Sequence, residues 1–283
     1  MAISPPVTRT ATRQIELRQI CYSPQTLASV PDGMLALDYQ DNARPDWREY
    51  WPIRQFLLNN VLAEDTLYGF FSPKFGYKTG LDSAKVHTFI SQDHAHHDAY
   101  FFSPFWDLSS FFVNIFEQGD FFHPGLTKAS QLFVDSIGWS TNVKFHVTHS
   151  QNTVFCNYIV ANKAFWLKWL ALSERLFFAA EHPDADPVLQ ALLKDDTTYG
   201  EQRLPLKVFL LERLASLLLM NETKLKAKGY DCFQLSPSIT PLNQFFNEAV
   251  QCNALKLAYD QSASPFNLHA FMNLRNQVFQ QLH

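Results

Sequence analysis

The sequence lacks the features that identify several common classes of protein. Its 283 residues include 23 basic and 27 acidic ones, without a basic stripe, so a general nucleic-acid binder is not expected. It has no Gly-x-Ser-x-Gly motif and therefore gives no indication of Ser-His-Asp catalysis. It has no internal repeat and no low-complexity linker, which indicates one compact unit.

The sequence also has no apolar run that is long enough to cross a bilayer. The longest is Leu204–Met220, and it is interrupted by Lys207, Glu212 and Arg213. The N-terminus carries arginines but no apolar signal-peptide core. The four cysteines are scattered without a Cys-x-x-Cys spacing, as expected for reduced and mostly buried thiols. We therefore expect a cytoplasmic protein that is soluble or at most peripheral at a membrane.

Aromatic residues are abundant instead. The chain has 26 Phe and is 47% hydrophobic, which is enough apolar material for a large core. Such a Phe content fits a Phe-rich core, and it also fits stacking surfaces for sugars or bases. Both interpretations stay open at this stage.

The stretch from residue 67 to residue 126 is the densest in these features. Two apolar runs, Leu67–Phe71 and Ala99–Phe102, each end at Ser-Pro, and the helix-like segment Asp82–Gln92 lies between them. This order predicts a βαβ unit with a parallel pair of strands. Loops that follow such strands lie at the carboxyl edge of the sheet, where α/β proteins bind their ligands.

The fold predicted from the whole pattern is α/β. We expect a flexible N-terminus over 1–13, a Rossmann-like region with a mainly parallel sheet over 14–183, and a helical C-terminal region over 184–283 packed on it. Further strands are expected at Gln14–Tyr22, Met34–Tyr39, Val143–Thr148, Thr153–Val160 and Asp231–Leu235. Helices are expected at Pro52–Ala63, Leu108–Phe116, Thr127–Ile137, Asn162–Ala180, Pro187–Leu193, Leu204–Met220, Pro241–Tyr259 and Pro265–Leu282.

Three segments resemble glycosyltransferase-like proteins of bacterial polysaccharide biosynthesis, which carry a GT-A-type nucleotide-sugar domain. They are DAYFFSPF (Asp98–Phe105), EQGDFFHPGL (Glu117–Leu126) and NTVFCNYIVANKAFWLKWL (Asn152–Leu170). The first is similar to the strand end that carries an acidic motif, the second to a loop on the acceptor side, and the third to a strand and helix that line the sugar pocket. The resemblance implies a glycosyltransferase that moves a sugar from a nucleotide diphosphate to a glycan or lipid-linked acceptor, with residues 14–183 as the nucleotide-sugar-binding region.

This reading assigns expected roles to particular residues. Donor binding is expected from Tyr22, Ser72, Lys74, Phe75, Lys78, Glu212 and Arg213. Glu212 and Arg213 lie inside an apolar helix, where a charge needs a partner such as a phosphate or a solvated face. For the general base that takes a proton from the acceptor hydroxyl, the candidates are Glu117, Asp120 and His123.

A metal site is one of two open possibilities. Enzymes that resemble this chain often present Asp-x-Asp to a divalent cation, but the matching triplet here is His96-His97-Asp98. His96 and Asp98 could hold Mn²⁺ or Mg²⁺. A metal-free site in which Lys74, Lys78 or Arg213 neutralises the diphosphate is equally compatible.

Two other functions also fit the sequence. A non-catalytic carbohydrate-binding or scaffold protein could keep the fold without the Asp-x-Asp motif. A metal-dependent hydrolase could use His94, His96 and Asp98, although Ala99 stands where the zinc signature of such hydrolases has a further His. An ordinary polar loop at residues 94–98 is the simplest alternative.

Overall fold

A computed structural model describes residues 13–282 of the chain. The predicted flexible N-terminus over 1–13 therefore lies almost entirely outside the described residues. Within them, no helix is both long enough and apolar enough to span a membrane.

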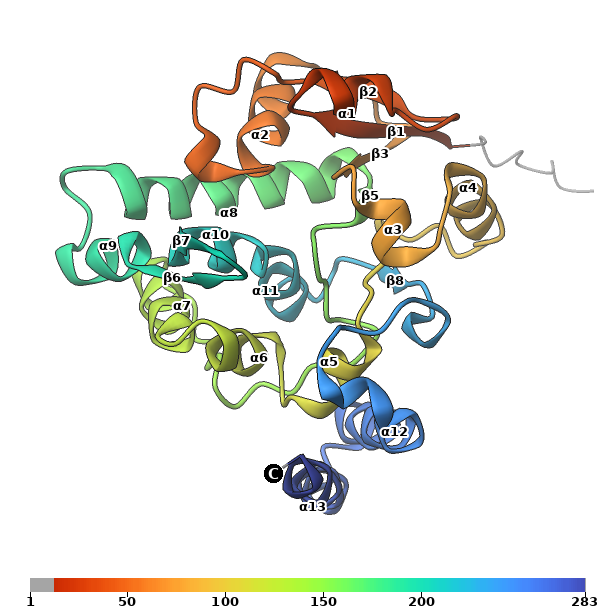
Figure 1. Cartoon of the computed structure of the whole chain (residues 1–283), viewed down its shortest axis with the longest axis vertical. Coiled ribbons are helices and arrows are strands. Elements are labelled where there is room, and N and C mark those ends of the chain that lie inside the picture. The colour runs from red at the N-terminus through yellow and green to blue at the C-terminus, as the bar shows by residue number, and fades with distance from the viewer. Residues whose placement is uncertain (1–12, 283) are drawn as a thin grey trace, which may run out of the picture.

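A mixed sheet of six strands organises the fold, and its β1–β2 edge lies at the upper end of the molecule in Figure 1. The strand order is β2-β1-β3-β5-β4-β8, and only β5 runs against the other strands. This confirms the predicted α/β class with a Rossmann-like, mainly parallel sheet. The strands are β1 (Gln14–Cys21), β2 (Leu35–Asp38), β3 (Thr66–Phe71), β4 (Ala99–Phe101), β5 (Ile159–Ala161) and β8 (Ala227–Gly229).

Helices cover both faces of this sheet. The side chains of β3 alternate between two cores: Leu67 and Phe71 face one, and Tyr68 and Phe70 face the other. The first core lies under α3 (Phe75–Thr79) and α4 (Ser83–Ser91). The second lies under α2 (Tyr50–Asn59) and α8 (Lys163–Glu181). A strand that is buried on both faces reads as a continuous apolar run, which is why β3 was predictable.

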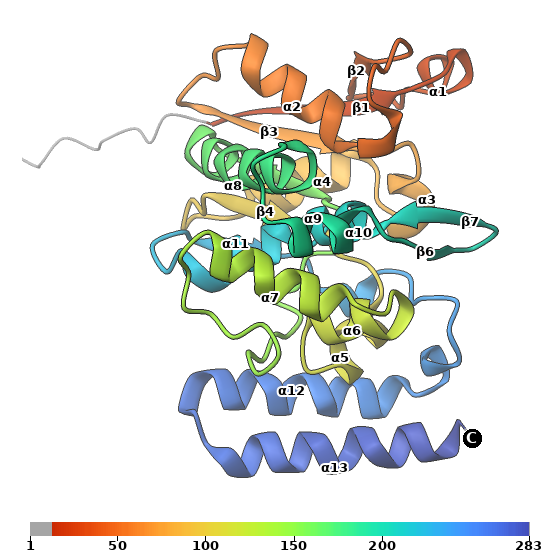
Figure 2. The same cartoon turned by 90° about the vertical axis from the view of Figure 1, so that its left-hand side faces the viewer.

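The remaining elements extend the second core away from the sheet (Figure 2). Helices α12 and α13 form an antiparallel pair at the end of the molecule, and α12 packs on α5. The elements are α1 (Pro24–Ala28), α5 (Trp106–Phe111), α6 (Ile115–Phe122), α7 (Leu126–Ser136), α9 (Pro187–Lys194), α10 (Leu206–Leu211), α11 (Leu214–Asn221), α12 (Phe246–Ser262), α13 (Pro265–Gln281), the hairpin of β6 (Asp196–Tyr199) and β7 (Gln202–Pro205), and the short 3₁₀ turns Pro45–Trp47, Cys232–Gln234 and Pro241–Gln244.

The two strands predicted to form a parallel pair, β3 and β4, are not neighbours in the sheet. β3 and β4 point the same way, but β5 lies between them and pairs with both: Ala161 is opposite Tyr68 on one side and Ala99 on the other. The chain leaves β4, builds α5, α6 and α7, and returns in the opposite direction. A short apolar run carries no information about its direction, so the sequence could not show this.

Several local predictions were also wrong. Residues 143–148 form no strand, and the predicted strand Thr153–Val160 is extended only from Ile159. The predicted strand over 231–235 is instead a 3₁₀ turn at Cys232–Gln234, and the strand of this region is β8, which comes just before it. The predicted helix over 204–220 is β7, α10 and α11, and it is broken at Glu212 and Arg213. The predicted loop over 117–126 is largely helical, because Asn114 caps α6 with hydrogen bonds from the amides of Phe116 and Glu117.

Lys256 joins the helical pair to the rest of the fold through a buried cation. Its Nζ donates to the carbonyl oxygens of Ser109 and Phe112 at the end of α5, and it lies over the Phe271 ring. Burial lowers the pKa of Lys256 to about 7. The other charged or thiol groups that act on it are Cys252, Glu117, Arg275 and Cys232.

We expect this lysine to make stability depend on pH. The unfolded chain holds the Lys256 proton up to a pKa of about 10.4, and the folded chain loses it near 7, so the free energy of unfolding should rise between pH 7 and 8.5 by about 1 kcal/mol or more. Lys256→Met should flatten this rise, whereas the exposed Lys224→Met should keep it. Urea unfolding at pH 6.5, 7.5 and 8.5 measures the effect. Equal slopes in wild type and Lys256→Met would contradict it.

Candidate functional site

The boundary between β1 and β3 is the point where the sheet reverses its strand order. From β1 the chain passes to β2 on one side and then crosses to β3 on the other side. In open α/β sheets, the crevice beyond the carboxyl ends of strands at such a point is the usual ligand site. Tyr22 follows β1 here, and Ser72 follows β3. The carboxyl edge is therefore the expected ligand site of this sheet.

Polar side chains from distant segments meet at this edge. Lys78 Nζ, on α3, lies 3.2 Å from Cys156 Sγ, in the segment that leads into β5. The hydroxyls of Ser72 and Tyr158 lie 3.0 Å apart. Because β5 is antiparallel, its first residues come to the same edge as the last residues of β3. The antiparallel strand thus brings Cys156 and Tyr158 to the loop that holds Ser72 and Lys78.

Two carboxylates belong to the same cluster. Burial and then the negative charge of Glu49 raise the pKa of Glu212, while the charges of Arg213 and Lys78 oppose the shift. Burial raises the pKa of the Cys156 thiol to about 11, against the nearby Lys78 cation. Glu49 and Glu212 both add to that rise. A half-buried carboxyl with a raised pKa, beside a second carboxylate and a lysine, is typical of a group that exchanges protons.

The backbone around this cluster is strained. Six residues other than glycine have a positive φ in the described part of the chain, and four of them lie at or next to the cluster. These are Arg48 (47°), beside Glu49, and Phe105 (71°), Cys156 (60°) and Asn157 (52°). The Lys78 ammonium lies 5.8 Å from the centre of the Phe105 ring. Strained residues persist where the surrounding structure holds them, and they gather at functional sites.

Asn157 adds a buried polar atom without a partner. Its side chain is 9% exposed, and its Oδ1 accepts no hydrogen bond from any described residue. An unsatisfied buried acceptor costs about 1–3 kcal/mol. An N–H or O–H group of a ligand could donate to this oxygen, so an unpaired Asn157 Oδ1 is compatible with a site that hydrogen-bonds a substrate.

Three of the residues predicted to bind a donor meet in this cluster: Ser72, Lys78 and Glu212. Tyr22, half-exposed, and Lys74, exposed, follow β1 and β3 at the same edge. Phe75 is instead part of the core, where its ring stacks on Phe71 at 4.1 Å and is 3% exposed.

Arg213 is buried and does not face outward. Its guanidinium donates to the carbonyl oxygens of Ile115 and Phe209 and to Oε1 of Gln118. Burial lowers its pKa to about 10, although Glu212 counteracts the shift. Arg213 is therefore a buried positive charge that acts on Glu212, and each of its three guanidinium nitrogens already donates to a protein acceptor.

The three predicted base candidates lie on or just after α6. Glu117 forms a two-point ion pair with Arg275 at 3.0 Å, and Asp120 accepts from the amides of Gly125 and Thr127. Both carboxylates hold local structure. His123 is buried and stacked on Phe209, and burial, followed by the Arg213 charge, lowers its pKa to about 4. A histidine with that pKa is a weak base at neutral pH.

The predicted metal ligands lie at the opposite edge of the sheet. Asp98 precedes β4, so it is at the amino edge, where it accepts from Asn162 Nδ2 and the Lys226 amide. His94 and His96 are exposed in the preceding turn. Among residues 13–282 no cluster of three or more His, Cys, Asp or Glu side chains is arranged to hold a metal ion. These residues therefore do not fit the cation that the resemblance implies.

Sequence reasoning missed Glu49, Cys156, Asn157 and Tyr158. The last three lie in NTVFCNYIV, which the resemblance had already placed at a sugar pocket, so that segment carried a signal. Glu49 lies at the carboxyl edge because it is the residue directly before α2, and nothing in the neighbouring sequence indicates a functional role for it. No family model, curated protein or solved structure matches this chain.

Proposed function

We propose that the protein is a glycosyltransferase that binds a nucleotide-diphosphate sugar at the carboxyl edge of its sheet and transfers the sugar to a glycan or lipid-linked acceptor. The observation that carries the proposal is the cluster of Lys78, Glu212 and Glu49 at the strand-order reversal between β1 and β3. The resemblance of three sequence segments to glycosyltransferase-like proteins supplies the reaction class.

The chemistry assigns a role to each group. The Lys78 ammonium would neutralise the diphosphate of the donor and of the leaving nucleotide. Glu212, whose pKa is raised, would take the proton of the attacking hydroxyl. The acceptor oxygen then bonds to the anomeric carbon, and the bond from that carbon to the diphosphate breaks. Asn157 Oδ1 would accept a hydrogen bond from the donor, and the exposed Tyr22 ring offers a surface for the base.

Binding of UDP or GDP tests the proposal directly. We expect one of them to bind the wild type and Lys78→Met to weaken that affinity about ten- to hundred-fold, because a charge-assisted phosphate contact is worth about 1.5–3 kcal/mol. Titration calorimetry, run with and without Mn²⁺, measures the affinities.

Lys224→Met is the matched control. Lys224 is exposed and precedes β8, so it lies toward the amino edge, and its loss should leave nucleotide affinity unchanged. Failure of both nucleotides to bind the wild type would refute the proposal. An unchanged affinity in Lys78→Met would remove this edge from the donor site.

A non-catalytic carbohydrate-binding protein is the second candidate. It is favoured by the structural use of Glu117 and Asp120 and by the misfit of the predicted metal ligands. Such a protein would bind a sugar without turning over a nucleotide donor, so a transfer assay on the nucleotide-binding wild type distinguishes the two.

A further inference from the structure

A groove separate from the carboxyl edge runs between α8 and the helices α7, α9 and α11. It consists of two adjoining cavities, of about 220 and 600 Å³, which share Ile137 and Arg175. None of the residues of the carboxyl-edge cluster lines either cavity. Cavities of several hundred Å³ that combine apolar walls with a few polar groups are typical of small-ligand sites.

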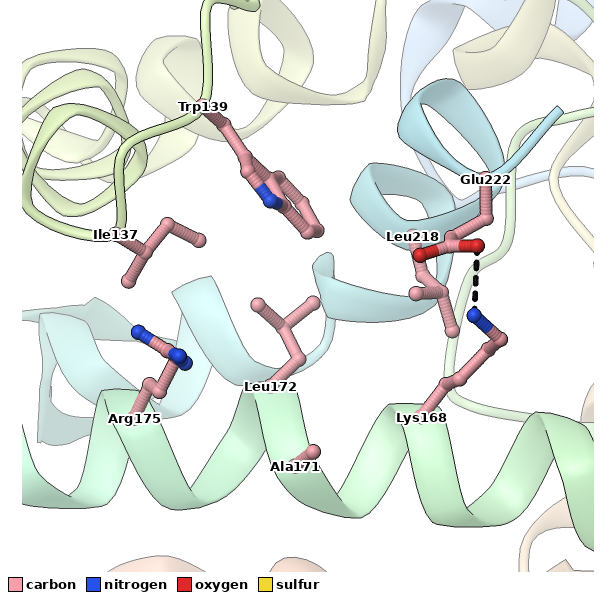
Figure 3. A pocket seen from close by; sticks show the side chains of 8 residues that line it. All are labelled: Ile137, Trp139, Lys168, Ala171, Leu172, Arg175, Leu218 and Glu222. Atoms are coloured by element: carbon pink, nitrogen blue, oxygen red, sulfur yellow. Dashed lines mark hydrogen bonds and ion pairs between the residues drawn. The ribbon is translucent and has the colours of Figure 1, made fainter.

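The smaller cavity has an apolar floor and one aromatic wall (Figure 3). Leu172 of α8 and Leu218 of α11 point into it from below and from the side, and the Trp139 indole extends over them from the segment after α7. Trp139 is only half-buried, so part of its ring remains accessible. An accessible indole beside aliphatic side chains suits the C–H face of a sugar ring.

Polar groups stand at both ends of this floor. Lys168 and Glu222 form an ion pair of 2.7 Å at one end (Figure 3). Arg175 stands at the other end, exposed and without a hydrogen bond or ion pair to any described residue. The two cations are seven positions apart on α8, which is about 10 Å along the helix axis. That length suits a short run of sugar rings whose hydroxyls meet donors and acceptors at each end.

The charges of the groove do not select an anion. Asp184 and Asp186 line the larger cavity and offset the Arg175 cation that both cavities share, whereas the Glu174 carboxylate at the same cavity is already paired with Arg54. A neutral ligand with many hydroxyls fits this balance better than an acidic one.

We propose that this groove binds a neutral oligosaccharide, with one sugar ring against Trp139 and hydroxyls on Arg175 and on the Lys168–Glu222 pair. The choice of a glycan rests on the proposed transferase function, because a glycan acceptor or product must then be held. The groove would retain the growing chain at a distance from the reacting end.

A panel of immobilised neutral and acidic oligosaccharides, followed by calorimetry on the strongest neutral binder, tests the inference. We expect Trp139→Ala to weaken binding about ten-fold or more, and Arg175→Met to weaken it about three- to ten-fold through lost hydrogen bonds. The matched controls Phe145→Ala and Arg203→Met change an exposed aromatic and an exposed arginine outside the groove and should bind like wild type. Binding should change little with salt concentration, since the ligand is neutral.

Retention of no neutral oligosaccharide would overturn the inference, and so would wild-type affinity in both groove variants. Retention of acidic glycans alone, with affinity that falls steeply with salt, would also overturn it. UDP and GDP affinities measured on the same variants separate the two proposals. If nucleotides bind but glycans do not, the groove inference fails by itself; if glycans bind the groove but nucleotides do not bind, the transferase proposal fails by itself.

Discussion

Glu212→Gln is expected to lower the rate of sugar transfer by about 10²–10⁴-fold, the usual contribution of a general base. Gln keeps the size and much of the polarity of the side chain but cannot take the proton of the acceptor hydroxyl. Nucleotide affinity should stay within about three-fold of wild type, because Lys78 and not Glu212 is assigned to the diphosphate. Initial rates of transfer to the acceptor, or to water when no acceptor is supplied, measure the effect.

The pH dependence of the same rate gives a second readout. The base must be deprotonated, so the wild-type rate should fall as the pH drops through the pKa of Glu212, and burial raises that pKa above the ordinary value for a glutamate. Glu212→Gln should lose this acidic limb. Glu201→Gln, an exposed change on the β6–β7 hairpin, is the matched control and should keep both rate and profile. A Glu212→Gln protein that transfers sugar at the wild-type rate would exclude Glu212 as the base.

Gly119→Ala is expected to destabilise the protein by about 2–4 kcal/mol. A Cβ at Gly119 in α6 would lie 2.3 Å from Cδ2 of Leu126 and 2.5 Å from Nε and Nη2 of Arg213, which three hydrogen bonds hold in place. Overpacking of this kind costs about 1–3 kcal/mol, and displacing the guanidinium weakens bonds to buried acceptors as well. The free energy of unfolding in urea measures the loss.

Gly76→Ala is the matched control, because Gly76 is also helical but stands in α3 with room for a methyl group. The nearest atom to its added Cβ is the Leu81 carbonyl oxygen at 3.6 Å, an ordinary contact. This change should be neutral or stabilise by up to about 1 kcal/mol through helix propensity. Equal stabilities in the two variants would show that Leu126 and Arg213 both move aside at little cost, despite the hydrogen bonds that Arg213 makes.

The sheet was predictable from local pattern, whereas its pairing was not. β3 and β4 are apolar runs closed by Ser-Pro, and this pattern is independent of the rest of the chain. The position of β5 between them depends on a return of the chain after residue 102, which no local signal encodes. The sequence did not predict the break between α10 and α11 at Glu212 and Arg213. Apolar residues continue with helical spacing on both sides of these two charges, so the pattern favours one unbroken helix.

The candidate site was predictable to the extent that it follows from strand ends and from charged residues in apolar segments. Ser72 and Lys78 come after β3, and Glu212 was conspicuous as a carboxylate in an apolar helix. Asp98 precedes its strand, and in a parallel arrangement that order alone places it at the amino edge. Glu49 and Cys156 reach the cluster through the crossover helix and the antiparallel strand, so their proximity is purely tertiary.

The placement of β5 also has a consequence for how the chain can fold as it is synthesised. After residue 101 has emerged, β2, β1 and β3 can pair, and β4 exists as a separate segment, but the edge of β3 has no partner until residues 159–161 arrive. From the end of β3 to the start of β5, roughly ninety residues of synthesis, an apolar strand edge stays open to other chains. Completion of the sheet is thus a late, long-range event, and truncation before β5 would leave an aggregation-prone edge in place of a smaller domain.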